Sequence, residues 1–181
     1  MKIDQHGWLS DSTHKPSPNH NDRPENTAIS LLVVHSISLP PGRYDGCFIE
    51  DFFQNKLVAD QHPYFSEIAD QKVSSHILIK RDGSIIQFVS LLKRAWHAGV
   101  SCFDGADDCN DFSIGIELEG TDHTAFENAQ YLQLAEITNA IKTLYPEINL
   151  DRIVGHSDVA PIRKTDPGTE FDWRRFRALL D

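Results

Sequence analysis

Short apolar runs along this chain predict β-strands, because most of them are flanked by polar or turn-forming residues. Four apolar residues precede His35 and predict a buried strand. In the segment before Gly120, apolar residues alternate with glycine and glutamate, which predicts a strand with one apolar face. Asp82-Gly83 favours a tight turn and predicts a hairpin. The predicted strands cover 30–35, 73–80, 84–89, 114–119 and 151–155.

Apolar residues spaced three or four apart predict three helices. A short helix is expected near 48–58. Thr124 and Glu127 form a capping-box pattern before a long helix, and Pro146 ends that helix. Asp172 is expected to cap a last helix. Because strands and helices alternate along the chain, the fold class is α/β or α+β, with helices packed on a sheet.

The chain of 181 residues suits one domain with a single buried core. Residues 1–29 are polar and contain prolines, which predicts an irregular arm packed against the domain formed by residues 30–181. No apolar stretch approaches the roughly 20 residues that span a bilayer. The first residues also lack the hydrophobic core of a signal peptide. We therefore expect a cytoplasmic protein.

Composition narrows the possible partners. The chain has 17 basic and 27 acidic residues and a formal net charge of −10, which argues against a general nucleic-acid binder. A local cationic pocket for an anionic small substrate stays compatible with this charge. The three cysteines form no Cys-x-x-Cys pair, so free thiols in a reducing compartment are expected. A bridge between Cys102 and Cys109 is the alternative.

Two histidines stand at the ends of predicted strands, and an aspartate comes ten positions after the second. These residues are His35, His156 and Asp166. Side chains converge beyond strand ends in sheet-based folds, and two imidazoles with one carboxylate can hold zinc while leaving a fourth position for water. This pattern predicts a zinc hydrolase. The alternative for Asp166 is a routine Asp-Pro-Gly turn, in which the aspartate binds local backbone amides.

Four other polar residues have a functional and an ordinary interpretation. Glu117 either faces solvent like Glu119 or points into the zinc cleft as a general base. Lys164 either lies near the metal or is a solvated loop lysine. His76 lies within a predicted strand, where a hydrogen-bonded core histidine is the default. His97 follows Trp96 in a loop of small residues and lines a pocket in the functional interpretation.

The chain resembles a known family, the AmpD-type N-acetylmuramoyl-L-alanine amidases. They belong to a superfamily that also contains a phage lysozyme and the peptidoglycan recognition proteins. The matching stretches follow the same order and cover most of the chain. They are LLVVHSISLPPG (31–42), SSHILIKRDGSIIQFV (74–89), KRAWHAGVS (93–101), CNDFSIGIELEG (109–120), VGHSDVAPIRKTDPG (154–168) and FDWRRF (171–176).

The resemblance implies roles for individual residues. One zinc ion per chain is expected on His35, His156 and Asp166, with Glu117 as the catalytic carboxylate and Lys164 as the cation beside the metal. Further substrate-binding candidates are Lys72, Trp96 and His97. Lys72 stands where an arginine would clamp a carboxylate with two hydrogen bonds, and lysine loses that geometry. Ser36 and Ser157 also depart from residues common in the family.

The resemblance also implies a fold, a substrate and a biological setting. The fold is a single domain with a central mixed β-sheet flanked by helices. The reaction is hydrolysis of the amide between N-acetyl-anhydromuramic acid and L-alanine of muropeptides during cytosolic recycling of the cell wall. A small-molecule muropeptide is the expected partner, with no nucleic acid, membrane or obligate protein partner. The alternatives are a module that binds peptidoglycan without cleaving it and a zinc peptidase with another amide specificity.

Overall fold

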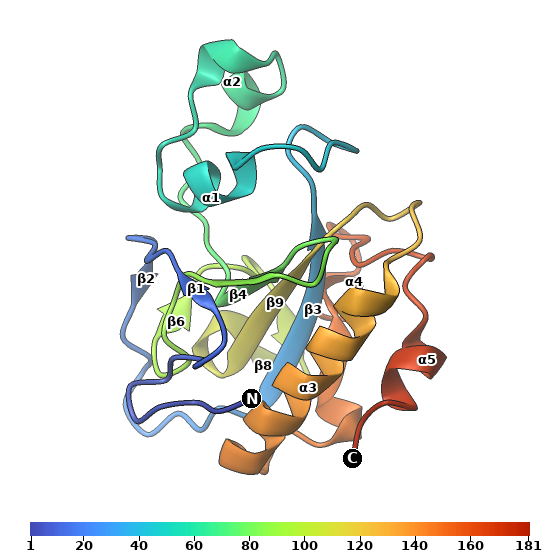
Figure 1. The fold of residues 1–181 in the computed structure, drawn as a ribbon. Coiled ribbons are helices and arrows are strands. Elements are labelled where there is room, and N and C mark those ends of the chain that lie inside the picture. Colours follow the sequence, from blue (N-terminus) through green and yellow to red (C-terminus); the bar gives the residue numbers. More distant parts are fainter.

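The computed structural model describes all residues from 1 to 181 and contains a six-stranded mixed sheet (Figure 1). Only β4 and β5 run antiparallel, and the other neighbours are parallel. In sheet order the strands are β1 (Thr13–His14), β5 (Ile85–Gln87), β4 (Ile77–Ile79), β9 (Ser113–Glu119), β3 (Leu31–Ile37) and β10 (Ile153–Gly155). This arrangement confirms the predicted mixed sheet with flanking helices.

Helices lie on one face of the sheet and beyond one end of its strands (Figure 1). Figure 1 shows α3 running across the sheet with α5 beside it, whereas α1 and α2 lie beyond one end of the strands. The α-helices are α1 (Phe48–Phe53), α2 (Phe65–Ile68), α3 (Asn128–Leu144), α4 (His156–Val159) and α5 (Trp173–Arg177). None of these helices is long and apolar enough to cross a membrane.

Small elements complete the fold. The short strands are β2 (His20–Asn21), β6 (Arg94–Ala95), β7 (Cys102–Phe103) and β8 (Ala106–Asp107). The 3-10 helices are η1 (Ala59–Gln61), η2 (Cys109–Asp111) and η3 (Leu150–Arg152). The first 29 residues add β1 to the edge of the sheet and pair β2 with β6, while the boundary at residue 30 stays a prediction.

The strands β3 and β9 form the centre of the sheet and are paired over seven residues. The predicted apolar face of β9 is confirmed, and every residue of the strand is buried, so Glu117 and Glu119 do not face solvent as their ordinary interpretation required. A central strand of a largely parallel sheet is covered on both faces. On one face Ile114, Ile116 and Leu118 join the core beneath α3. On the other face, Glu117 lines a cleft.

Two helix boundaries differ from expectation. The first helix ends at Phe53 rather than near residue 58. The long helix begins at Asn128, and its capping pair is Glu127 with Gln130 rather than Thr124 with Glu127. Thr124 instead accepts a hydrogen bond from the hydroxyl of Thr121. The cap of the last helix is confirmed, because Asp172 Oδ1 accepts from the backbone N of Arg175 at 2.9 Å.

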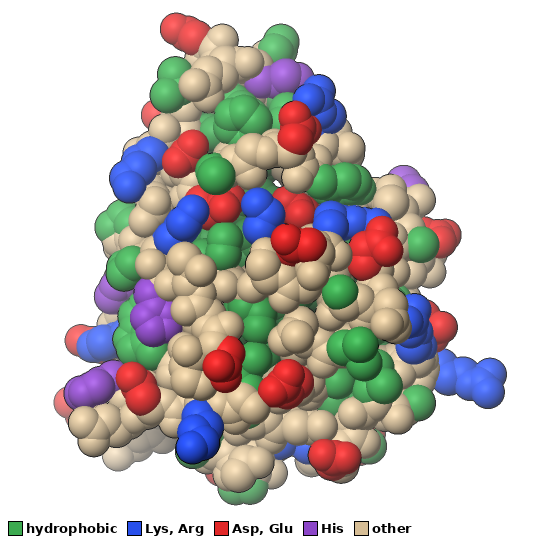
Figure 2. Space-filling model, in the orientation of Figure 1, with side chains coloured by type: hydrophobic (Ala, Val, Ile, Leu, Met, Phe, Trp, Pro, Cys, Tyr) green, Lys and Arg blue, Asp and Glu red, His purple; other side chains and the backbone are tan.

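Charge and cysteine chemistry match the composition. On the face shown in Figure 2, Lys and Arg side chains lie among Asp and Glu side chains without a continuous basic patch. Cys47, Cys102 and Cys109 are all free, so the alternative bridge between the last two is not formed.

Candidate metal centre and cleft

Three side chains from separate parts of the chain converge at one edge of the sheet. His35 lies on β3, and His156 follows β10 directly. Because β3 and β10 are parallel neighbours, with Val34 opposite Gly155, both strands deliver a histidine to the same edge. Asp166 reaches them from the loop after α4. Three potential ligand atoms, one from each side chain, lie within 4.8 Å of one another.

The spacing of these atoms fits a shared metal ion. The two Nδ1 atoms of His35 and His156 are 2.9 Å apart. Asp166 Oδ2 lies 3.2 Å from the first and 3.0 Å from the second. Ligand atoms at two corners of a zinc tetrahedron are roughly 3.3 Å apart when each bond is about 2.0–2.1 Å. The donor set of two nitrogens and one oxygen also suits zinc.

The proton positions of both imidazoles favour the same conclusion. His156 Nε2 lies 3.1 Å from the carbonyl oxygen of Ala98, to which only a protonated nitrogen can donate. A neutral histidine with its proton on Nε2 has a free lone pair on Nδ1. Burial lowers the pKa of His35 to about 4, so the His35 ring is neutral at pH 7. The Nδ1 atom of His156 can therefore act as a metal ligand, and that of His35 can do so when its proton lies on Nε2.

Glu117 lies beside His35, because the two residues are partners in the register of β9 and β3. Its side chain lines the cleft, and its Oε2 atom has no hydrogen-bond partner. Burial, followed by the charge of Asp166, raises the pKa of the Glu117 carboxyl well above its usual value, against the opposing charge of Lys164. The site therefore holds an unpaired carboxyl group next to the cluster of ligand atoms.

Lys164 occupies the wall of the cleft two residues before Asp166. Its backbone N–H donates to the carbonyl of Ala160 at 2.9 Å, which closes the turn after α4. Its side chain lines the same cleft as Glu117 and Asp166. The structure thus brings a cation, a carboxyl group and the ligand cluster into one cavity.

The cleft has a volume of about 530 Å³ and two unlike walls. One wall is largely apolar and comes from α1, α2 and the adjoining loops; it includes Leu39, Phe52, Phe53, Tyr64 and Ile68. The other carries polar groups from the ends of β3 and β9; it includes Ser36, Ser38, Thr121 and Asp122. This lining suits a ligand with both polar and apolar parts.

The three candidate binding residues differ in position. Trp96 and His97 line the cleft. Lys72 is exposed and lies outside the lining, although its neighbours Gln71 and Val73 belong to it. A role for Lys72 in binding stays a prediction.

Sequence reasoning missed two residues that shape the site. Asn110 holds the backbone of His97 and Ala98 through its side chain. Gly115 faces His97, and a Cβ atom there would lie 2.5–2.7 Å from three ring atoms of that histidine. A glycine within a buried strand often marks the close approach of another group, so Gly115 could have been recognised from the sequence. Nothing in the sequence around Asn110 indicated its role.

His76 has the ordinary role that sequence analysis favoured. It is fully buried. Its Nδ1 accepts from the backbone N of Gly115 at 3.0 Å, and its Nε2 lies 3.0 Å from the carbonyl oxygen of Lys93. His76 is therefore a hydrogen-bonded core histidine.

Comparison with known proteins adds a family. The family model described as N-acetylmuramoyl-L-alanine amidase matches residues 25–169. The 1,6-anhydro-N-acetylmuramyl-L-alanine amidase AmpD of Citrobacter freundii is 54% identical over 99% of this chain and 95% of its own length. A crystal structure of a selenomethionine derivative of AmpD, also 54% identical, covers all of both chains with a TM-score of 0.97.

A more distant structure contains a bound substrate. The N-acetylmuramyl-L-alanine amidase AmiD of Escherichia coli was solved with anhydro-N-acetylmuramic acid-L-Ala-D-gamma-Glu-L-Lys. It is 26% identical to this chain, with a TM-score of 0.62 over 98% of this chain and 65% of its own.

Proposed function

Because the chain belongs to the N-acetylmuramoyl-L-alanine amidase family, we propose that it is a zinc-dependent hydrolase that cleaves the amide between N-acetyl-anhydromuramic acid and L-alanine of muropeptides. The observation that carries this proposal is the convergence of two imidazole nitrogens and one carboxylate oxygen in a cleft. The preference for the anhydro sugar is supported by the relatives that carry it in their name. We propose recycling of the cell wall in the cytoplasm as the setting.

In this proposal His35, His156 and Asp166 hold the zinc ion. When bound, zinc acidifies water towards a pKa of about 7 and polarises the carbonyl of the amide. The two imidazoles contribute neutral Nδ1 atoms, and the carboxylate contributes Oδ2. Three protein ligands are typical of a catalytic zinc, whereas a structural zinc is usually closed by four.

Glu117 is the general base in this mechanism. Its carboxylate accepts a proton from water as the water attacks the carbonyl carbon, and the protonated carboxyl then donates to the leaving nitrogen of alanine. A carboxyl group with a raised pKa suits this task, because it must hold a proton between the two steps. Its unpaired Oε2 atom is available for this transfer.

Lys164 stabilises the negative charge that develops on the carbonyl oxygen. Its ammonium group needs no reorganisation if it already lies in the cleft when that charge forms. An interaction that grows stronger as the transition state forms speeds turnover more than it strengthens binding. Lys164 therefore complements Glu117, which moves the proton.

The test uses two substrates. The purified protein is incubated with an anhydro-muropeptide and, separately, with intact cell wall, and the products are analysed by mass spectrometry. Release of a peptide with a new N-terminal alanine from the anhydro-muropeptide is expected. Cleavage at another amide would favour a zinc peptidase, and binding without cleavage would favour a recognition module. Either result would overturn the proposal.

A further inference from the structure

The outward-facing nitrogens of both ligand histidines contact one dipeptide. His35 Nε2 lies 2.9 Å from His97 Nδ1. His156 Nε2 lies 3.1 Å from the carbonyl oxygen of Ala98. We propose that the dipeptide His97–Ala98 is a positioning element that orients both imidazoles towards the metal, an inference that rests on the zinc site of the proposed function. His97 is then a positioning residue rather than a substrate-contacting one.

The hydrogen-bond directions follow from the ligand role of Nδ1. If His35 offers the lone pair of Nδ1, its proton sits on Nε2 and is donated to His97 Nδ1. His97 must then carry its own proton on Nε2, which lies 3.2 Å from Ser113 Oγ. The chain from His35 through His97 to Ser113 thus has one consistent set of donors and acceptors. Such outer partners fix the tautomer and the orientation of a ligand histidine.

Both ring nitrogens of His97 are engaged within the protein. Nδ1 contacts His35 and Nε2 contacts Ser113, so neither nitrogen is free to bind a substrate. The ring also fits closely over Gly115, where an added Cβ atom would lie 2.5 Å from its Cγ atom. The position of His97 is therefore built into the sheet, although the residue borders the cleft.

Asn110 holds the backbone of the dipeptide in place through hydrogen bonds. The side-chain oxygen of Asn110 accepts from the backbone N of His97 at 3.1 Å and from the backbone N of Ala98 at 2.8 Å. Asn110 is only 6% exposed, so this carbonyl makes its two hydrogen bonds away from solvent. One amide side chain thereby fixes the backbone of both positioning residues.

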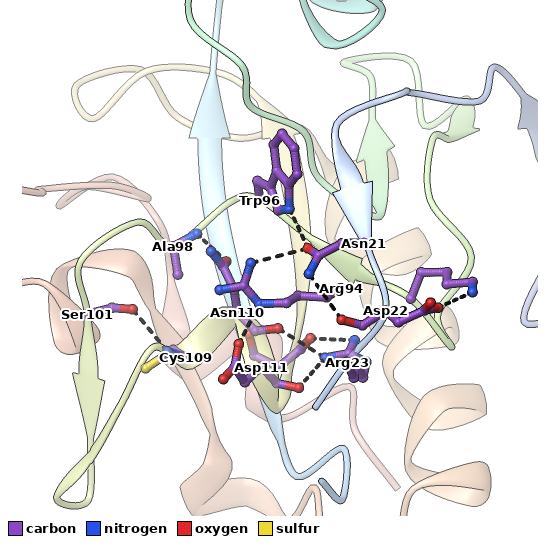
Figure 3. Close-up of polar contacts among 12 residues, drawn as sticks. Asn21, Asp22, Arg23, Arg94, Trp96, Ala98, Ser101, Cys109, Asn110 and Asp111 are labelled. Carbon is purple, nitrogen blue, oxygen red and sulfur yellow. Dashed lines mark hydrogen bonds and ion pairs between the residues drawn. The ribbon is translucent and has the colours of Figure 1, made fainter. Parts of the chain in front are cut away.

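The N-terminal arm hydrogen-bonds to the backbone around Asn110. Arg23 donates to the backbone oxygen of Asn110 at 3.1 Å and to that of Asp111 at 2.8 Å (Figure 3). The same guanidinium donates to the backbone oxygen of Ser113 at 2.8 Å. Figure 3 shows Asn21, Arg94 and Trp96 beside this junction, where Trp96 donates to Asn21 at 2.7 Å. The support for the metal centre therefore extends into a segment remote in sequence.

The test compares two isosteric variants of the full chain. His97→Asn keeps an acceptor near the position of Nδ1, whereas His97→Leu has nearly the same shape and no acceptor. Zinc affinity is measured by competition with a chromophoric chelator, a readout that needs no substrate. His97→Leu should weaken zinc binding by about 10–100-fold, the usual cost of losing an outer partner of a ligand histidine. His97→Asn should bind zinc like the wild type.

Thermal unfolding of the metal-free proteins checks that both variants fold. If His97→Leu does not fold, Ser113→Ala replaces it, because that change removes the acceptor for His97 Nε2–H and should also weaken zinc binding. Nitrogen-15 NMR of the zinc-bound wild type should show the proton of His35 on Nε2.

Three outcomes would overturn the inference while leaving the zinc site intact. These are wild-type zinc affinity in His97→Leu and Ser113→Ala, equal losses in His97→Leu and His97→Asn, or a raised KM with unchanged zinc affinity in His97→Leu. The last would make His97 a substrate contact. A wild type that binds no zinc would instead overturn the proposed function, and this inference with it.

Discussion

Glu117 is 8% exposed, and its side-chain Oε2 atom has no hydrogen-bond partner. An unpaired polar group costs stability when it is buried, and a charged one costs more. Active sites retain such groups because activity requires them, at the expense of stability. The same side chain should therefore affect both the rate of the reaction and the stability of the fold, in opposite senses.

Replacing Glu117, the proposed base, should separate the effect on catalysis from the effect on metal binding. Glu117→Gln keeps the size of the side chain but cannot accept the proton from water, so turnover should fall by roughly 100-fold or more. Zinc content should stay at one ion per chain, because Glu117 is outside the ligand cluster. Turnover is measured with an anhydro-muropeptide and zinc by elemental analysis. A rate close to that of the wild type would assign the base elsewhere.

The same substitution should stabilise the metal-free protein in a pH-dependent way. The folded state raises the pKa of Glu117 above the unfolded value of about 4.3, so wild-type stability declines as pH rises past that value. Asp166 and Lys164 are the charged groups that face it, and burial has the largest effect. Glutamine does not ionise, so the variant should be more stable than the wild type at pH 7 and should gain almost nothing at pH 4.

Urea unfolding of both proteins after chelator treatment, at pH 4 and at pH 7, measures this difference. An equal gain at the two pH values would mean that the carboxyl charge is not its source.

The role of a residue was predictable where the sequence around it had a regular spacing. The alternation along β9 did not show which way Glu117 points, because a half-exposed strand and a strand bordering a cleft have the same local pattern. Its neighbour Glu119 is also buried, and accepts from the backbone N of Arg81 at 3.0 Å. Only the pairing of β9 with β3 on one side and β4 on the other distinguishes these two carboxylates from surface groups.

At the scale of elements, the start of α3 depends on one buried glutamine. Gln130 donates from Nε2 to the backbone oxygens of Ile79 and Glu119, and its Oε1 accepts from the backbone N of Glu127. It therefore ties the helix to β4 and β9. The sequence pattern was misread here, because Thr124 and Glu127 have capping-box spacing while the real pair lies three residues later.

Truncating this side chain should destabilise the protein strongly. Gln130→Ala leaves two carbonyls and one N–H without their partners, and we expect a loss of about 2–4 kcal/mol in the free energy of unfolding. Gln133→Ala, on the same helix but only partly buried, is the matched control and should change stability by less than about 0.5 kcal/mol. Urea unfolding monitored by circular dichroism gives both values, and similar losses in the two variants would refute the role of Gln130.

Strands were more predictable than caps for a physical reason. The runs that became β3, β4, β5 and β10 are short, apolar and flanked by turn residues, so local sequence was sufficient. Their ends were less well predicted: residues 150–152, for example, form η3 before β10 begins at Ile153. Terminal residues depend on hydrogen bonds to distant segments, which one sequence does not reveal.

At the scale of the whole molecule, the candidate metal centre depends on topology. His35 and His156 are 121 positions apart, and the parallel pairing of β3 with β10 brings them together. Residue types and strand ends indicated these candidates, but their convergence required the order of strands in the sheet. The arm that carries Arg23 shows what local sequence does not reveal. Its polar sequence did not indicate that the guanidinium of Arg23 donates to four backbone carbonyls of the domain.

Removal of the metal should therefore lower the stability of the fold as well as stop the reaction. A ligand that binds only the folded state adds about 4.1 kcal/mol to the free energy of unfolding when its concentration is 1,000 times Kd. Chelation should lower the unfolding temperature, and zinc should restore it, whereas magnesium should not, because it prefers oxygen ligands. The increase in unfolding temperature that zinc produces should be smaller at acidic pH, because protons compete with zinc for the imidazole nitrogens. Differential scanning calorimetry measures each state. An unchanged unfolding temperature in protein verified to be metal-free would mean that the ion does not join β3, β10 and the loop of Asp166.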